Sequence, residues 1–143
     1  MLTVKTPELE LTQVWWDSDP EHNRVRFTFP IHREAGAQDS AVVYFELQPG
    51  ERLNTHTDSE EEILYIVSGE VEEHVGDESG RASAGDLVLI PAMAPHGAVN
   101  VGDETVKVVG FFAGSVVDSA FEEPIQPLGV TEVTSGAPAP VAA

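Results

Sequence analysis

Residues 50–69 read GERLNTHTDSEEEILYIVSG, and this stretch combines a strand pattern with a cluster of candidate metal ligands. His56 and Asp58 are two residues apart, so on a strand their side chains project to the same face. Glu62 has the same parity and opens an apolar run that ends before Gly69. The segment predicts two strands that bring imidazole and carboxylate groups toward one interior.

Residues 85–100 read GDLVLIPAMAPHGAVN and supply the second half of this pattern. An apolar run ends at Pro91, and His96 follows Pro95, so two prolines restrict the backbone near this histidine. If this segment packs beside residues 50–69, two imidazoles and one or two carboxylates meet inside the fold. Such a ligand set, with coordination positions left open, suits divalent iron, manganese, cobalt, nickel or zinc.

Strand signals dominate the rest of the chain. Runs rich in β-branched and aromatic residues recur at short intervals, with turn residues between them and no convincing helical period. This pattern favours an antiparallel sandwich or barrel over alternating strands and helices. The expected strands lie at 42–47, 63–67, 71–75, 86–90 and 106–112, with shorter ones at 13–16 and 25–29.

The two quoted segments resemble the two motifs of the cupin superfamily. The first motif is Gly, five residues, His-x-His, three or four residues, Glu, six residues, Gly. The chain matches it at Gly50, His56, Glu62 and Gly69, and has Asp58 in place of the second histidine.

The second cupin motif is Gly, five residues, Pro-x-Gly, two residues, His, three residues, Asn. Gly85, Pro91, His96 and Asn100 match it, and Met93 stands in the glycine position. With the flanking strands, the resemblance covers roughly residues 40 to 113.

The resemblance implies an all-β fold, a single jelly-roll (double-stranded β-helix) barrel of six to eight strands. It also implies a divalent metal held by His56, Glu62 and His96. The Pro/Ala-rich end of the chain is expected to be a mobile tail. The expected parts are N-terminal strands at 1–39, a barrel core at 40–113, a C-terminal extension at 114–130 and the tail at 131–143.

Asp58 departs from the family pattern, and three arrangements are open for it. Asp58 ligates the metal directly, or it holds a metal-bound water, or the pocket binds no metal. Because aspartate is shorter than histidine, its reach decides among them. We expect a metal with three firm ligands and Asp58 as fourth ligand or water holder. In a reaction, Asp58 is the candidate general base or water-positioning residue.

Composition limits the function classes. The chain has 143 residues, enough for one domain with a buried core, and no cysteine, which excludes disulfides and thiolate chemistry. Seven basic residues against 25 acidic ones give a net charge of −18, which argues against nucleic acid and anionic membranes as partners. No apolar run is long enough to span a bilayer and no secretory signal is visible, so we expect a cytoplasmic protein.

Two hypotheses of function remain open. The first is a metal-dependent enzyme of oxygenase, isomerase or lyase type, acting on a small organic molecule such as an enol, a catechol or a β-dicarbonyl compound. The second is a non-catalytic module that binds or senses a small ligand in the same pocket. The fold alone does not choose between them.

The remaining expectations concern assembly and the other aromatic and histidine side chains. We expect a homodimer, because residues 9–29 are long enough to cross to a partner and to cover a sheet edge. Trp15 and Trp16 are expected in a core or an interface. His22, His32 and His74 are expected at the surface. Aromatic and methionine side chains of alternating orientation are the candidate pocket walls: Tyr44, Phe45, Tyr65, Met93, Phe111 and Phe112.

Overall fold

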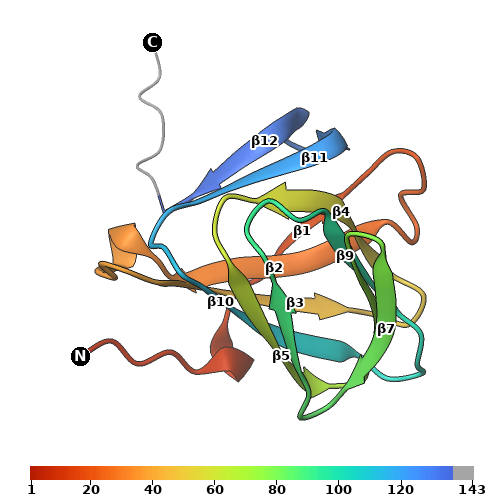
Figure 1. Cartoon of the computed structure of the whole chain (residues 1–143), viewed down its shortest axis with the longest axis horizontal. Helices are drawn as coiled ribbons and strands as arrows, with labels where there is room; N and C mark the ends of the chain where they lie inside the picture. Colours follow the sequence, from red (N-terminus) through yellow and green to blue (C-terminus); the bar gives the residue numbers. More distant parts are fainter. Residues whose placement is uncertain (137–143) are drawn as a thin grey trace.

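The computed structural model describes residues 1–136 and consists almost entirely of antiparallel strands arranged in two six-stranded sheets around one core (Figure 1). No α-helix occurs among these residues, only two short 3₁₀ turns, η1 (Thr6–Glu8) and η2 (Arg33–Ala35). None of the described residues forms a helix that is long and apolar enough to cross a membrane. The all-β jelly-roll prediction is confirmed.

In spatial order the first sheet contains β1 (Thr12–Trp15), β2 (Arg24–Ile31), β3 (Ala41–Leu47), β10 (Val106–Phe112), β5 (Glu62–Ser68) and β8 (Leu87–Ile90). In spatial order the second sheet contains β12 (Val130–Ser135), β11 (Val117–Ile125), β4 (Arg52–Asp58), β9 (His96–Asn100), β6 (Glu70–Val75) and β7 (Glu78–Ser83). Between β3 and β11 the chain crosses repeatedly from one sheet to the other, and only the β6–β7 hairpin keeps two consecutive strands of this part in one sheet.

Period-two alternation determines which side chains enter the core. Along β5, Glu62, Leu64 and Ile66 are buried, whereas the residues between them are exposed. The side chains of β10 alternate in the same way. Glu62 therefore lies on the inner face of the first sheet, opposite the strands of the second.

The described residues hold twelve strands, more than the six to eight expected. Two of the additional strands lack the signals used for prediction: β7 has the polar sequence ESGRAS, and β11 contains a proline and several acidic residues. The tail predicted from residue 131 is wrong for residues 131–135, because β-branched residues there pair with β11 as β12. The rest of that prediction, residues 137–143, lies outside the described residues.

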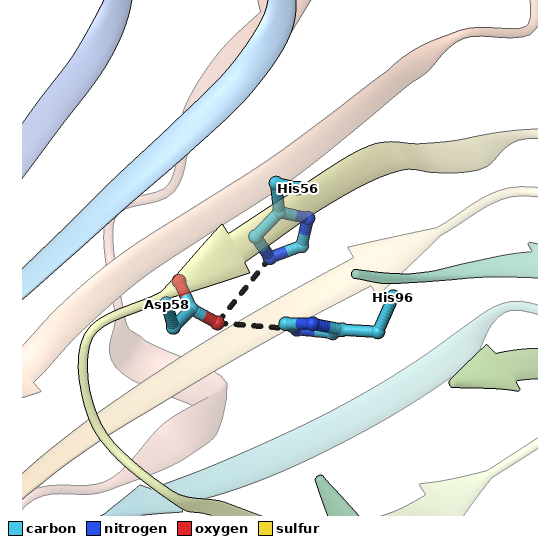
Figure 2. A group of neighbouring side chains, drawn as sticks. All are labelled: His56, Asp58 and His96. Carbon is cyan, nitrogen blue, oxygen red and sulfur yellow. Dashed lines mark ion pairs between the residues drawn. The ribbon is translucent and has the colours of Figure 1, made fainter. Parts of the chain in front are cut away.

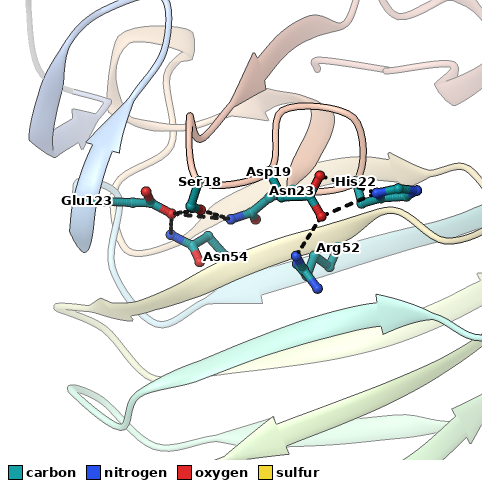
Figure 3. A network of polar contacts seen from close by, with 7 residues as sticks. All are labelled: Ser18, Asp19, His22, Asn23, Arg52, Asn54 and Glu123. Carbon is teal, nitrogen blue, oxygen red and sulfur yellow. Dashed lines mark hydrogen bonds and ion pairs between the residues drawn. The ribbon is translucent and has the colours of Figure 1, made fainter.

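A polar network joins the loop between β1 and β2 to the second sheet (Figure 3). Glu123 Oε1 accepts hydrogen bonds from Ser18 Oγ (2.6 Å), Asn23 Nδ2 (3.3 Å) and Asn54 Nδ2 (3.4 Å). Beside it, Arg52 pairs with Asp19 at 3.0 Å. The loop between β1 and β2 is therefore fixed to β4 and β11.

Tryptophan and backbone contacts hold the same end of the barrel. Trp16 is fully buried and packs against Phe121 on β11, with ring centroids 5.1 Å apart. Backbone hydrogen bonds between Trp15 and Gln126 join the two sheets directly. The expectation of core packing is confirmed for Trp16.

The outer face of the first sheet is apolar and exposed along three adjacent strands. Phe111 lies opposite Ile63, which lies opposite Leu89, and Tyr65 lies opposite Leu87. Contiguous patches of this kind are uncommon on monomers and mark interaction surfaces. Its six large apolar side chains are Ile63, Tyr65, Val67, Leu87, Leu89 and Phe111.

The homodimer stays a prediction, and this apolar face is the surface through which we expect the two chains to contact each other. A second copy suits the face because the six side chains carry no charge, whereas the net charge of −18 makes the two chains repel elsewhere. We expect the wild-type chain to be a dimer by light scattering and Leu87→Glu to be a monomer. Leu128→Glu, at an exposed leucine outside the patch, serves as control and should stay dimeric. A monomeric wild type at high concentration contradicts the prediction.

Candidate metal centre

Strands from both sheets bring the predicted ligands into one cavity. His56 on β4 and His96 on β9 are register partners in the second sheet, and both are buried. Asp58 follows on β4 with the same inward orientation as His56, as their spacing predicts. Glu62 reaches the same cavity from β5 of the facing sheet.

Each imidazole is oriented by a backbone carbonyl two residues before it. His56 Nδ1 lies 2.8 Å from Asn54 O, and His96 Nδ1 lies 2.9 Å from Ala94 O. A carbonyl only accepts, so each Nδ1 carries the hydrogen and donates it. Both Nε2 atoms therefore face the cavity, which is the arrangement that metal-binding histidines adopt.

The three inward atoms lie close to one another (Figure 2). Asp58 Oδ2 is 3.4 Å from His56 Nε2 and 3.1 Å from His96 Nε2. Glu62 Oε1 lies somewhat farther away, 3.6 Å from His96 Nε2. Each of His56, Asp58 and His96 offers one ligand atom, and these three atoms lie within 4.8 Å of one another.

The Asp58 side chain is long enough to reach both histidines. Its Oδ1 accepts a 2.6 Å hydrogen bond from Ser119 Oγ on β11, which turns Oδ2 toward the histidines. Asp58 Oδ2 and His96 Nε2 are both buried without a hydrogen bond of good geometry. Buried polar atoms of this kind normally have a partner, and a divalent cation fits both.

Without a metal ion, the charges of the site favour a proton on His96, which faces the position that a bound cation would occupy. Burial acts to raise the pKa of Asp58, but the close contacts with His56 and His96 outweigh it and hold this pKa well below its usual range. Burial acts to lower the pKa of His96, but interactions with Asp58 and Glu62 raise it to about 10. Burial raises the pKa of Glu62. His96 therefore carries a positive charge beside the Asp58 carboxylate.

Gly110 on β10 leaves the space that Glu62 occupies. A Cβ atom at this position would overlap Glu62 Oε2 and would lie 2.8 Å from a Val43 methyl group. The glycine is buried and its φ is not in the left-handed region, so its lack of a side chain is what matters. No sequence motif indicated this residue.

Apolar side chains form the rest of a cavity of about 80 Å³, space for several waters or one small organic molecule. Phe45 and Phe112, two of the predicted walls, line it, whereas Tyr65, Met93 and Phe111 are exposed. No lysine or arginine of residues 1–136 lines it. Further apolar walls are Trp16, Val25, Phe27, Phe29, Leu53, Leu64 and Phe121.

Glu73 on β6 is a cavity residue that the sequence analysis missed. Its neighbours Glu72 and His74 suggest a surface strand, but Glu73 is only 6% exposed. Its Oε2 has no hydrogen-bond partner, and burial raises its pKa to about 8. Parity was the available signal, because Glu73 alternates with Val71 and Val75 on a strand whose inner face is buried.

The other polar residues of the motifs have structural roles. Asn100 donates from Nδ2 to the carbonyls of Leu47 and Glu104, and its side chain so stabilises the turn after β9. His74 is partly exposed on the face of β6 opposite to Glu73, and it contacts Thr55 Oγ1 at 3.0 Å. The strand pairing of β6 with β9 holds it there. His22 is exposed, and His32 accepts a hydrogen bond from Glu34 N.

Solved structures share this fold. A predicted oxalate decarboxylase from Thermotoga maritima superposes with a TM-score of 0.68 at 19% identity, over 79% of this chain and 99% of its own. The polyketide cyclase RemF from Streptomyces resistomycificus gives 0.64 at 18% identity, over 78% of each chain. Oxalate decarboxylase from Lactobacillus farciminis, in a formate complex, gives 0.65 at 24% identity over 68% of this chain.

This chain spans only 31% of the length of the Lactobacillus enzyme. None of the curated proteins matches it. The family model described as "Cupin domain" matches residues 43–112. This range includes all four candidate ligands: His56, Asp58, Glu62 and His96. The family model and the fold of the solved structures agree, and residues 43–112 of this chain are a cupin domain.

Proposed function

We propose that this protein is a metal-dependent enzyme in which His56, His96 and Asp58 bind a divalent ion and Glu62 completes or adjusts the site. The observation that carries the proposal is the convergence of His56 Nε2, His96 Nε2 and Asp58 Oδ2 in a buried cavity. Two carboxylates and two neutral imidazoles balance the charge of a divalent ion.

An ion bound there would supply Lewis acidity to a carbonyl, enol or phenol oxygen of a ligand. The protein's own groups have separate tasks. Asn54 O and Ala94 O fix the imidazole rings, and Ser119 fixes Asp58. The apolar walls exclude bulk water. The predicted role of Asp58 as a base or water-positioning residue stays a prediction.

The substrate class we propose is a small, mostly apolar molecule with one oxygen-bearing end, such as an enol, a phenol or a β-dicarbonyl compound. The cavity walls are predominantly aliphatic and aromatic, and its acidic groups are Asp58, Glu62 and Glu73. A dianion such as oxalate would meet these carboxyl groups with no lysine or arginine from residues 1–136 beside it. In this respect the polyketide cyclase is a better guide to the substrate than the oxalate decarboxylases.

The second candidate function, a ligand-binding or sensor module without catalysis, uses the same cavity. The observation that favours it is Asp58 in place of the usual second histidine of the motif. Both candidates predict ligand binding, and only the enzyme predicts turnover of the bound molecule.

Metal content tests the proposal. We expect protein purified without chelator or nickel affinity resin to contain close to one divalent ion per chain, measured by elemental mass spectrometry. His96→Ala should lose it, because it removes one of the two imidazoles. His22→Ala removes an exposed histidine and should leave the content unchanged. If the wild type binds none of iron, manganese, cobalt, nickel or zinc after anaerobic incubation, the proposal fails.

Metal binding should release a proton and strengthen as pH rises. In the metal-free site the pKa of His96 is raised to about 10, so a proton occupies the position that the ion needs until well above neutral pH. Apparent affinity should therefore rise about tenfold per pH unit for each proton displaced. Calorimetric titration in buffers of different ionisation enthalpy measures that release. Affinity that stays constant between pH 6 and pH 9 contradicts this prediction.

Ligand discrimination tests the substrate class. We expect the metal-loaded protein to bind 4-nitrocatechol, an aromatic ligand with two adjacent oxygens whose absorption reports its ionisation, more tightly than oxalate. Phe112→Ala should weaken 4-nitrocatechol binding, because this side chain is a cavity wall. Phe111→Ala, at the exposed neighbouring residue, is the matched control. Preferential binding of oxalate would refute the proposed class.

A further inference from the structure

A second hollow, a groove, lies next to the metal cavity, and the proposed function does not use it. A groove of about 520 Å³ lies between the β6–β7 hairpin and β8, at the edges of the two sheets opposite the polar network of Figure 3. Its lining includes Val75, Ala82, Val88 and Pro91. Glu73 lines both this groove and the metal cavity, so its side chain stands at the boundary between them.

Gly80 keeps the groove open above Glu73. In the pairing of β6 with β7, Gly80 is the register partner of Glu73, and partners in an antiparallel pair share one face. A Cβ atom built at Gly80 meets nothing within 4 Å, and its φ is not in the left-handed region. Neither crowding nor backbone conformation requires glycine here, and a long side chain at this position would lie on the same face of the hairpin as Glu73.

The Glu73 carboxyl is free to act at that boundary. It is 6% exposed, and its Oε2 has no hydrogen-bond partner among residues 1–136. No ion pair with another of these residues holds it, in contrast to Asp58, which lies within 3.4 Å of both histidines. The ionisable groups around it are His96 on β9, Glu62 on β5, His56 and Asp58 on β4, and Glu78 and Arg81 on the groove side.

We propose that Glu73 carries protons between a ligand in the metal cavity and water in the groove. The Glu73 carboxylate accepts a proton from an O–H or C–H group of the ligand and becomes neutral. It then gives this proton to water or hydroxide in the groove and is a carboxylate again. One proton moves and no electrons are transferred, so the step needs no further reactant.

This inference rests on the proposed function and extends it. The raised pKa of Glu73, about 8, places its titration near neutral pH, where a proton carrier is most effective. The organic ligand then occupies the apolar metal cavity, and the proton leaves through the groove, whose lining also includes the charged residues Glu78 and Arg81.

Cobalt-loaded protein provides the test, because the visible spectrum of Co(II) reports charge changes beside the site. After a rapid pH jump we expect a spectral relaxation in the wild type that Glu73→Gln abolishes. Gly80→Leu should slow it by at least about tenfold, since a side chain then covers the carboxyl. Glu72→Gln, at the exposed neighbour on the same strand, should behave as the wild type. All four proteins should bind cobalt equally.

Three results would overturn the proposal: a relaxation that persists in Glu73→Gln, a rate unchanged in Gly80→Leu, or loss of cobalt from Glu73→Gln, which would make Glu73 a ligand.

If the wild type itself binds no cobalt, the proposed function fails separately. Carboxyl ¹³C NMR of metal-free protein then decides the inference. The Glu73 signal should titrate near pH 8 and shift further upward in Gly80→Leu. An ordinary glutamate titration, or no effect of Gly80→Leu, overturns it.

Discussion

His96 Nε2 lies 3.1 Å from Asp58 Oδ2 inside a barrel whose other walls are mostly apolar, and neither atom has a well-formed hydrogen bond. In such surroundings unbalanced charge is costly, so the site needs either a proton on His96 or a cation between the two groups. Several surrounding groups fix the positions of these side chains and of Glu62. Backbone carbonyls orient the rings, Ser119 holds Asp58, and Gly110 leaves space for Glu62.

The barrel explains how these groups come together from distant parts of the chain. β4 and β9 are neighbours in the second sheet, so His56 and His96 become register partners although 40 residues separate them in sequence. Glu62 arrives from the facing sheet because the chain crosses between sheets after β4. The network around Glu123 and the contact of Trp16 with Phe121 join the sheets at one end of this cavity.

Sequence reasoning identified the ligand cluster because spacing on a strand fixes which face a side chain occupies. His56, Asp58 and Glu62 follow this rule, and prolines constrain the backbone near His96. It failed for Glu73, where the acidic neighbourhood suggested a solvated strand although parity with Val71 indicated the interior. It also missed β7 and β11, whose polar composition gives no strand signal and whose pairing depends on long-range partners. The apolar outer face required the register of three strands before it could be recognised.

X-ray absorption spectroscopy of the metal-loaded protein tests the central claim most directly, because it counts the atoms bound to the ion. The account predicts two imidazole ligands, from His56 and His96, together with carboxylate oxygen. It also predicts that one imidazole signal disappears in His96→Ala. An ion surrounded only by oxygen ligands, with no imidazole scattering, would contradict the account, because the ion would then lie outside the cavity that the two histidines share.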